Sequence, residues 1–254
     1  MLSLEQVNKN FGGLPALSDV SFALQQGRLT AVIGPNGAGK STLINCITGI
    51  LRLDHGSIRF REQAIAGMPT HAISRLGIAR TFQNLRIFPR LSLLDNVLTG
   101  LTGEGGDSLL LAMLRLPSLR HRERRLKLRA LAALDRFGLT EKADWPAGAL
   151  AYGDKKRLEL ARAIVGQPQL LLLDEPVAGL NAEETQAVGE QLKLLRSNGH
   201  TMLLVEHDMD LVMGIADHVV VLDSGRCIAT GTPDEVRRNP LVLEAYLGRM
   251  EPTA

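Results

Sequence analysis

A short glycine-rich run carries the residue types that bind phosphate groups. It reads Gly34-Pro35-Asn36-Gly37-Ala38-Gly39-Lys40-Ser41-Thr42 and fits the pattern G-x-x-x-x-G-K-[ST]. Such glycines let successive backbone N–H groups face the phosphates, and a helix that begins near Lys40 would add its positive N-terminal dipole. We expect Lys40 to reach the β- and γ-phosphates of a nucleoside triphosphate and the Ser41 hydroxyl to bind Mg²⁺. The alternative is a chance glycine-rich turn.

A second element places two carboxylates directly after an apolar run. Leu170–Leu173 is typical of a strand buried on both faces, and Asp174 and Glu175 follow it. Ligands bind at the carboxyl ends of such strands, so Asp174 is suited to hold Mg²⁺ through water. Glu175 would orient and partly deprotonate an attacking water. A solvated Asp-Glu pair is the alternative, but it does not explain why the pair lies between the leucines and Pro176.

The overall composition is that of a compact protein. The chain has 254 residues, 45% hydrophobic content and a net charge of +2, so the charge balance does not call for nucleic acid. Cys46 and Cys227 lie in apolar segments without metal-ligand spacing, which predicts buried thiols in a reducing compartment. We expect no secretory signal, no membrane span and a cytoplasmic location.

The distribution of apolar residues predicts an α/β fold. Alternation at Leu2, Leu4 and Val7 and again at Val20 to Leu24 predicts an N-terminal antiparallel β subdomain. Strand and helix patterns then alternate along the C-terminal part, as in a mostly parallel core sheet with covering helices. The expected C-terminal elements are Ala182–Ser197, Thr201–Val205, Met209–Ala216, Val219–Leu222 and one last helix over Asp234–Leu247. A helical lobe, with helices over Leu109–Leu116 and Ser118–Phe137, would interrupt the core.

Beyond these patterns, the chain resembles the ATP-binding-cassette (ABC) ATPases, which are P-loop NTPases, over nearly its whole length. Gln83 matches the family's glutamine loop, which touches Mg²⁺ and the attacking water. Leu150-Ala151-Tyr152-Gly153-Asp154 and the following helix match the signature segment. The resemblance implies a single cassette whose catalytic core spans residues 1–84 and 165–254, with a helical subdomain over about 85–164.

Three further matches complete the resemblance. His207, after the Thr201–Val205 strand, matches the switch histidine that contacts the γ-phosphate, and Phe11 matches the aromatic that stacks on adenine. Ala178–Asn181 matches the loop that crosses the dimer interface. The resemblance implies that two cassettes sandwich two ATP molecules, so that the signature segment of one closes the phosphate site of the other. An ordinary P-loop kinase would have no reason to carry the signature segment and the switch histidine.

The signature departs from the family's common Leu-Ser-Gly-Gly-Gln form. Ala151 lacks the serine hydroxyl that would donate to the γ-phosphate, and Asp154 replaces an amide. We interpret Asp154 as the N-cap of the following helix. The sharper hypothesis is that this segment makes a weaker composite ATP site on the partner cassette.

Several segments are similar to the ATPase subunits of branched-chain amino acid importers: Phe11-Gly12-Gly13, Arg80–Gln83, Arg86–Phe88, the Ala-Tyr-Gly core, Glu206–Met209, Gly231–Pro233 and Tyr246–Gly248. This resemblance implies a pair of membrane permeases as partners, a second ATPase copy or relative, and a periplasmic binding protein. It places the chain on the cytoplasmic face of the inner membrane. Urea or amide importers, and a soluble ABC ATPase acting on a protein assembly, stay open as alternatives.

A basic stretch from Arg120 to Arg129 holds six Lys/Arg residues, His121 and one acidic residue, Glu123. It lacks the aromatic residues typical of nucleic-acid binding. Apolar positions such as Leu126, Ala130 and Leu134 indicate one buried helical face with the charges opposite. A solvated face is therefore favoured, with anionic lipid headgroups as the next alternative.

Overall fold

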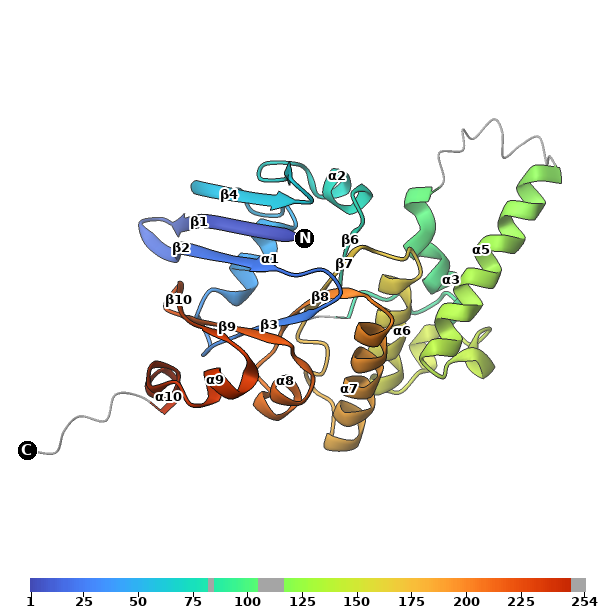
Figure 1. Ribbon diagram of the computed structural model, residues 1–254. Helices are drawn as coiled ribbons and strands as arrows, with labels where there is room; N and C mark the ends of the chain where they lie inside the picture. The colour runs from blue at the N-terminus through green and yellow to red at the C-terminus, as the bar shows by residue number, and fades with distance from the viewer. Residues whose placement is uncertain (82–84, 105–116, 248–254) are drawn as a thin grey trace, which may run out of the picture.

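The strands form two sheets in the computed structural model, which describes residues 1–81, 85–104 and 117–247 (Figure 1). The larger sheet has six strands in the order β10-β9-β3-β8-β7-β6. All neighbouring pairs are parallel except β9 and β10, which confirms the expected α/β core. The strands are β3 (Leu29–Ile33), β6 (Ile78–Arg80), β7 (Leu170–Asp174), β8 (Thr201–Val205), β9 (His218–Asp223) and β10 (Arg226–Gly231).

The central strands β3, β7 and β8 are buried at every position. Their residues alternate between two hydrophobic clusters, one on each face of the sheet. Leu172 and Leu203 belong to one cluster, and their neighbours Leu171 and Leu204 belong to the other. Side chains of a strand point to opposite faces in turn, so a sheet covered on both faces needs such continuous apolar runs.

A four-stranded antiparallel sheet lies over one face, in the order β2-β1-β4-β5. Its strands are β1 (Leu2–Phe11), β2 (Leu14–Leu24), β4 (His55–Phe60) and β5 (Gln63–Ala64). Helix α1 (Lys40–Ile47) lies between the two sheets (Figure 1), and its Leu43 and Ile44 join apolar residues of both sheets. The antiparallel β subdomain is therefore confirmed, and it holds α1 against the main sheet.

The opposite face is covered by α7 (Ala182–Ser197) and α8 (Met209–Ile215) (Figure 1). The single helix expected over Asp234–Leu247 is wrong. The structure has two helices instead, α9 (Pro233–Arg237) and α10 (Pro240–Leu247). Pro240 has no N–H to continue a helix and disfavours helical backbone in the residue before it, so the helix ends ahead of Asn239 and a new one begins.

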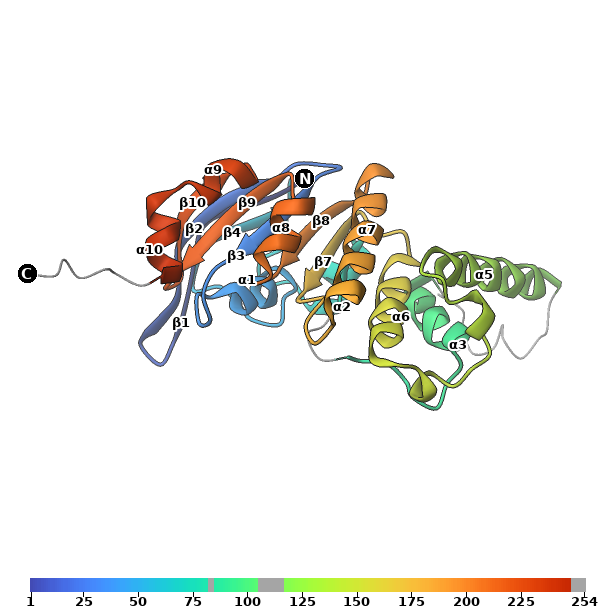
Figure 2. The same ribbon diagram turned by 90° about the horizontal axis from the view of Figure 1, so that it is seen from below.

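Between β6 and β7 the chain builds a helical lobe beside the sheet, where α3, α5 and α6 lie together (Figure 2). Buried residues of these helices, among them Val97, Leu134 and Leu158, form its core. The lobe contains α3 (Leu93–Leu98), the 3₁₀ helix η1 (Thr99–Glu104), α5 (Pro117–Arg136), the 3₁₀ helices η2 (Thr140–Lys142) and η3 (Ala147–Ala149), and α6 (Tyr152–Ile164); α2 (Thr70–Arg75) precedes β6. The helix expected over Leu109–Leu116 lies outside the described residues.

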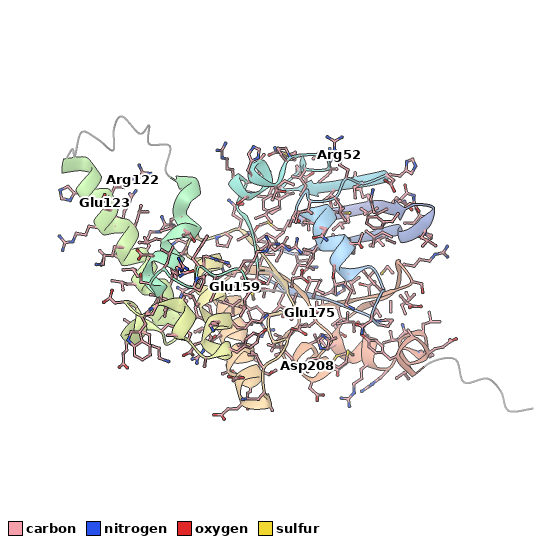
Figure 3. The ribbon with its side chains drawn as sticks, turned by 180° about the vertical axis from the view of Figure 1, so that it is seen from behind. Arg52, Arg122, Glu123, Glu159, Glu175 and Asp208 are labelled. Atoms are coloured by element: carbon pink, nitrogen blue, oxygen red, sulfur yellow. The ribbon has the colours of Figure 1, made fainter. Side chains whose placement is uncertain are left out.

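Helix α5 carries the basic stretch. Ala130 and Leu134 are buried while Arg124 and Lys127 are exposed, as the amphipathic pattern predicts. Figure 3 places Arg122 and Glu123 at the far end of α5, away from Glu175. Arg129 is an exception to the solvated face, because its guanidinium donates a 3.0 Å hydrogen bond to the carbonyl of Val165, the residue at the carboxyl end of α6.

The sequence predicted that both cysteines are buried thiols and that no segment spans a membrane. Cys46 is a buried free thiol, and burial raises its pKa to about 11; Cys227 is free and only partly buried. In the described part of the chain, no helix combines the length and apolar character needed to cross a bilayer.

Asn96 anchors the segment that enters the helical lobe. This fully buried side chain on α3 donates from Nδ2 to the carbonyl oxygens of Phe88 (3.0 Å), Leu91 (3.4 Å) and Ser92 (2.9 Å). Its Oδ1 accepts a 2.8 Å hydrogen bond from the N–H of Phe88. One amide therefore fixes the course of residues 88–92 through direct hydrogen bonds.

Replacing this amide by a carboxylate tests the anchor. Asn96→Asp should lower the free energy of unfolding by roughly 3 kcal/mol, because a buried carboxylate cannot donate to three carbonyls. Asn198→Asp, on an exposed residue, should change it by less than about 1 kcal/mol. Urea unfolding followed by circular dichroism measures both, and equal effects would contradict the role of Asn96.

Candidate functional site

The glycine-rich loop connects β3 to α1 in a backbone conformation that suits glycine. Gly34, Gly37 and Gly39 have φ angles of 152°, 82° and 99°. A Cβ atom on Gly34 would lie 2.0 Å from the carbonyl oxygen of Leu222, and one on Gly39 would lie 2.5 Å from that of Ala16. The loop is therefore packed tightly against β9 and β2, and glycine is needed at these positions.

Lys40 is the first residue of α1 and is only 6% exposed. Its Nζ donates to the carbonyl oxygens of Gly34 (2.7 Å) and Pro35 (2.9 Å), so the ammonium lies over the loop. Burial lowers the pKa of Lys40, whereas the charges of Glu175, Asp174 and Glu206 act to raise it. These carboxylates therefore lie close enough to Lys40 to influence its charge.

The register of the parallel strands explains how these groups meet. Val205 at the end of β8 pairs with Val32 of β3 on one side and with Asp174 of β7 on the other. The carboxyl ends of three neighbouring strands therefore lie at one edge of the sheet. The glycine-rich loop, the Asp174-Glu175 pair and the Glu206-His207 pair follow these ends directly. The structure thus brings together the elements expected to handle the triphosphate.

Asp174 suits a metal site because one of its oxygens lacks a protein partner. Oδ2 accepts a 2.8 Å hydrogen bond from Arg80, whereas the buried Oδ1 has no hydrogen-bond partner among the described residues. Ser41, exposed in the first turn of α1, offers a hydroxyl directly after the loop. Hydroxyl, carboxylate and phosphate oxygens with water are the ligands Mg²⁺ prefers, so the residues present fit the ion. Bound there, Mg²⁺ would neutralise charge on the phosphate oxygens.

Glu175 has a strained backbone, with a φ of 48°. Its N–H donates to the carbonyl of Val205 (2.9 Å), and its own carbonyl accepts from Lys156 Nζ (3.3 Å) and from the N–H of Ala178 (3.2 Å). Such a conformation costs about 1–3 kcal/mol in a residue other than glycine and persists where surrounding contacts enforce it. Figure 3 shows Glu175 where the sheet meets α6, the helix that carries Glu159. These contacts fix the point from which the Glu175 side chain leaves the strand.

His207 stands at the same edge and its side chain is 59% exposed. Its N–H donates to Glu206 Oε2 (3.0 Å), and its Nδ1 lies 3.6 Å from the same oxygen. Glu206 is fully buried and also accepts from the N–H of Val177 (3.1 Å). Burial raises the pKa of Glu206, and the hydrogen bonds to backbone N–H groups oppose this shift. Glu206 therefore links the turn after β7 to the histidine.

Glu206 and Lys156 are two residues of this site that were not predicted from the sequence. Lys156 on α6 is 1% exposed, and its Nζ lies 5.9 Å from the Tyr152 ring centroid. Burial lowers the pKa of Lys156, opposed by nearby carboxylates of which Glu159 has the largest effect. Glu206 could have been found, because it follows a buried strand as Asp174 does. Nothing in the run Lys155-Lys156-Arg157 indicates that its middle residue points inward.

Phe11, the expected adenine-stacking residue, lies on the antiparallel sheet and not at this edge. Phe11 ends β1 and is 48% exposed, with Lys9 Nζ 5.6 Å from its ring centroid. Its strand pairs with β2, whose Ala16 contacts Gly39 of the loop, so the hairpin that carries Phe11 is fixed to the phosphate loop. Gln83 lies outside the described residues.

The sequence matches models of known protein families. The model of the ABC transporter family matches residues 17–178, which include the glycine-rich loop, the signature segment and β7. The chain belongs to the ABC transporter family. A second model, described as the branched-chain amino acid ATP-binding cassette transporter, matches residues 226–251. The expected family is therefore confirmed, while the roles of the individual site residues stay predictions.

Curated relatives match this ABC protein along its whole length. The high-affinity branched-chain amino acid transport ATP-binding protein LivG of Salmonella typhimurium is 43% identical over 249 residues, which is 98% of each chain. The corresponding protein BraF of Pseudomonas aeruginosa is 42% identical over 98% of each chain.

Solved structures agree on the fold. A nucleotide-free ATP-binding cassette from an ABC transporter is 33% identical, with a TM-score of 0.84 over 98% of this chain and 99% of that one. A cassette in its ADP conformation has a TM-score of 0.85 at the same identity and coverage. A dimeric cassette bound to ADP and phosphate, 23% identical, has a TM-score of 0.76 over 92% of this chain and 99% of that one, which shows the fold alone. The predicted ABC-cassette fold is confirmed.

The signature segment of this ABC protein corrects one expectation. Asp154 is not the N-cap of the signature helix, because α6 begins at Tyr152 and Ala151 occupies the cap position. The Asp154 carboxylate is buried and forms ion pairs with Lys142 (2.5 Å) and Arg157. It is therefore turned into its own helical lobe. The Tyr152 hydroxyl donates to the carbonyl of Ala178 (3.2 Å), and Asn181 caps α7 in a capping box with Glu184.

The cap position gives a test of the altered signature. Ala151 has φ −61° and ψ 160°, the backbone of an N-cap, but no side-chain oxygen to accept from the helix. Ala151→Ser should raise the free energy of unfolding by about 1 kcal/mol. If the partner's composite site is the weaker one, it should also raise ATP turnover in the reconstituted complex.

Urea unfolding and phosphate release measure the two effects separately. Ala182→Ser is the matched control, because α7 already has its cap in Asn181 and should gain nothing. Serine alone is the cleaner change, since Asp154→Gln would also remove both ion pairs of Asp154. Added stability without added turnover would count against the asymmetry.

Proposed function

We propose that this chain is the ATP-hydrolysing subunit of an importer for branched-chain amino acids. The observation that carries the proposal is the single sheet edge at which the phosphate loop, Asp174-Glu175 and Glu206-His207 meet. The class of cargo comes from the names of relatives that are 42–43% identical over 98% of the chain. Hydrolysis of ATP bound at this sheet edge would provide the energy for uptake through membrane permeases.

The first part of the mechanism is binding. Phe11 would stack on the adenine, and the loop N–H groups with Lys40 would hold the β- and γ-phosphates. Lys40 would exchange its hydrogen bonds to the Gly34 and Pro35 carbonyls for phosphate oxygens. Since the ammonium is already buried over the loop, this exchange needs little reorganisation. Ser41, Asp174 and Gln83 are the residues proposed to hold Mg²⁺.

The second part is attack on the γ-phosphate. Glu175 would accept a proton from the attacking water, and the backbone contacts of Glu175 keep its position fixed while it does so. His207 would contact the γ-phosphate from the neighbouring strand end, with Glu206 orienting its ring. Positioning and charge stabilisation, rather than covalent chemistry, would accelerate the transfer.

Pairing of two cassettes would complete the site. The residues described above cover the phosphates from one chain only. The backbone of Ala151, Tyr152, Gly153 and Asp154 of a second cassette would close the other side, with the N-terminus of α6 facing the γ-phosphate. ATP would thus hold two protomers together, and hydrolysis would release them. The partner is either a second copy or a related ATPase.

The remaining partners would meet the helical lobe. A groove between the core and the lobe is lined by residues of α2, β6, η1 and α6, together with the half-exposed Phe88 before α3. We propose that a permease contacts this groove from the membrane and that the chain sits on the cytoplasmic face. The catalytic core would then span residues 1–84 and 165–254 and the coupling subdomain about 85–164. A periplasmic binding protein would deliver the amino acid.

Removing the proposed base tests the ATPase. Glu175→Gln should retain ATP binding, stabilise the ATP-bound dimer and lower turnover by about 10²–10⁴-fold, because the amide cannot accept the proton. Phosphate release, nucleotide binding and size-exclusion chromatography report these effects. Glu190→Gln, an exposed glutamate on α7, is the control and should behave as the parent. Unchanged hydrolysis in Glu175→Gln would remove Glu175 from the role of base.

Co-purification tests the importer. Tagged protein drawn from a detergent extract of its own cells should bring down polytopic permeases. Substitution of Phe88 by aspartate should weaken that recovery about 10-fold or more, since it would place a charge in an apolar contact. Recovery of soluble complexes alone would instead favour an ATPase that acts on a protein assembly.

A further inference from the structure

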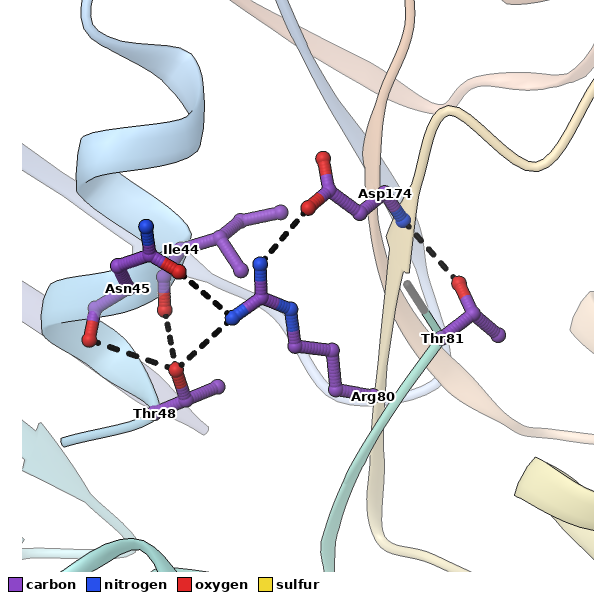
Figure 4. Close-up of polar contacts among 6 residues, drawn as sticks. All are labelled: Ile44, Asn45, Thr48, Arg80, Thr81 and Asp174. Carbon is purple, nitrogen blue, oxygen red and sulfur yellow. Dashed lines mark hydrogen bonds and ion pairs between the residues drawn. The ribbon is translucent and has the colours of Figure 1, made fainter. Parts of the chain in front are cut away.

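Arg80 at the end of β6 links α1 to the strand end that carries Asp174 (Figure 4). Its Nη1 donates to Asn45 Oδ1 (2.8 Å) and Thr48 Oγ1 (3.3 Å) on the last turn of α1. Its Nη2 donates to Asp174 Oδ2 at 2.8 Å. The side chains of Arg80 and Asp174 are 11% and 4% exposed, so water contributes little to their orientation.

The residue after Arg80 also holds Asp174. The backbone N–H of Asp174 donates to Thr81 Oγ1 (3.2 Å), and the N–H of Thr81 donates to Leu172 O (2.9 Å). Arg80 thus holds Oδ2 of Asp174, and Thr81, the next residue, holds its backbone N–H. The oxygen left over is Oδ1, which is buried and has no hydrogen-bond partner in the described ranges. A buried acceptor without a partner is unfavourable, as expected where a ligand supplies the missing contact.

The chemistry of arginine fits this arrangement. A guanidinium is planar and directs its N–H groups along fixed lines, so that anchoring Nη1 determines where Nη2 points. Asn45 lies on the helix that begins with Lys40 and Ser41, and Thr48 is the C-cap of that helix. The guanidinium therefore connects the helix that carries Ser41 to the carboxylate of Asp174, the two sides of the proposed metal site.

We propose that Arg80 is a positioning residue for the metal site: it holds Asp174 through Oδ2 in the orientation that leaves Oδ1 available to Mg²⁺. This inference rests on the proposed ATPase function. Arg80 itself touches neither the metal nor the nucleotide. Its positive charge also compensates the buried carboxylate, which would be costly if unpaired.

The experiment separates metal binding from nucleotide binding and turnover. Arg80→Gln is made in the Glu175→Gln background, which should bind ATP without consuming it. Mn²⁺, which also prefers oxygen ligands, replaces Mg²⁺, and electron paramagnetic resonance measures free Mn²⁺ in the presence of ATP. A fluorescent ATP analogue in EDTA measures metal-free nucleotide binding. We expect the Mn²⁺ affinity to fall about 10-fold or more, while metal-free nucleotide binding changes less than about two-fold.

Three further variants sharpen the test. Arg80→Lys keeps the charge but not the fork and should not restore Mn²⁺ affinity. Asn45→Ala removes one anchor and should weaken Mn²⁺ binding about three-fold in the Glu175→Gln background. Added to Arg80→Gln, it should cause no further loss, because both substitutions act through one guanidinium. Arg59→Gln, an exposed arginine on β4, should have no effect.

The contrary result is equally specific. If Arg80→Gln lowers the melting temperature but keeps its Mn²⁺ affinity within two-fold, the arginine is only a structural link and the proposal is wrong. Should Arg80→Gln fail to fold, the milder Asn45→Ala decides by the same criterion. If the parent itself does not bind ATP, the proposed function fails first and takes this inference with it.

Discussion

The parallel register of β3, β8 and β7 is the constraint on which the site depends. All positions of these strands are buried, and their residues alternate between two clusters. A shift by one residue would exchange the faces of an entire strand, so the packing of both clusters fixes the register. Because the strands are parallel, fixing the register also fixes which ends meet. The polar residues that follow the strands therefore share one edge.

Several charged side chains at that edge are buried. Burial lowers the pKa of Lys40 and of Lys156 and raises the pKa of Glu206, so each charge depends on its partners. Lys40 is held by loop carbonyls, Glu206 by backbone N–H groups, and Asp174 by Arg80. Removing one member of such a set leaves another buried charge uncompensated, which is far more costly than a surface ion pair.

The sequence could predict the parts of this site that follow from local patterns. The spacing of Gly34, Gly39 and Lys40 specifies a loop, and the leucines before Asp174 specify a buried strand, because both depend on near neighbours in the chain. The pairing of Asp154 with Lys142 joins residues 12 apart, and that of Arg80 with Asp174 joins residues 94 apart. These contacts arise from how helices and strands pack, which no local pattern contains. The break at Pro240 differs, since proline chemistry alone could have predicted it.

The position of Glu175 shows why the sheet alone does not define the site. Its N–H is held by Val205 of β8, whereas its carbonyl is held by Lys156 of α6 and by the N–H of Ala178. The strained φ of 48° persists because these contacts act from both sides of the peptide. Tyr152, one turn before Lys156 on α6, reaches the same segment through Ala178. Since α6 belongs to the helical lobe, the geometry of Glu175 depends on how that lobe is packed against the sheet. Hydrogen bonds from Lys156 and Tyr152 therefore link Glu175 and the segment after it to the signature helix of the same chain.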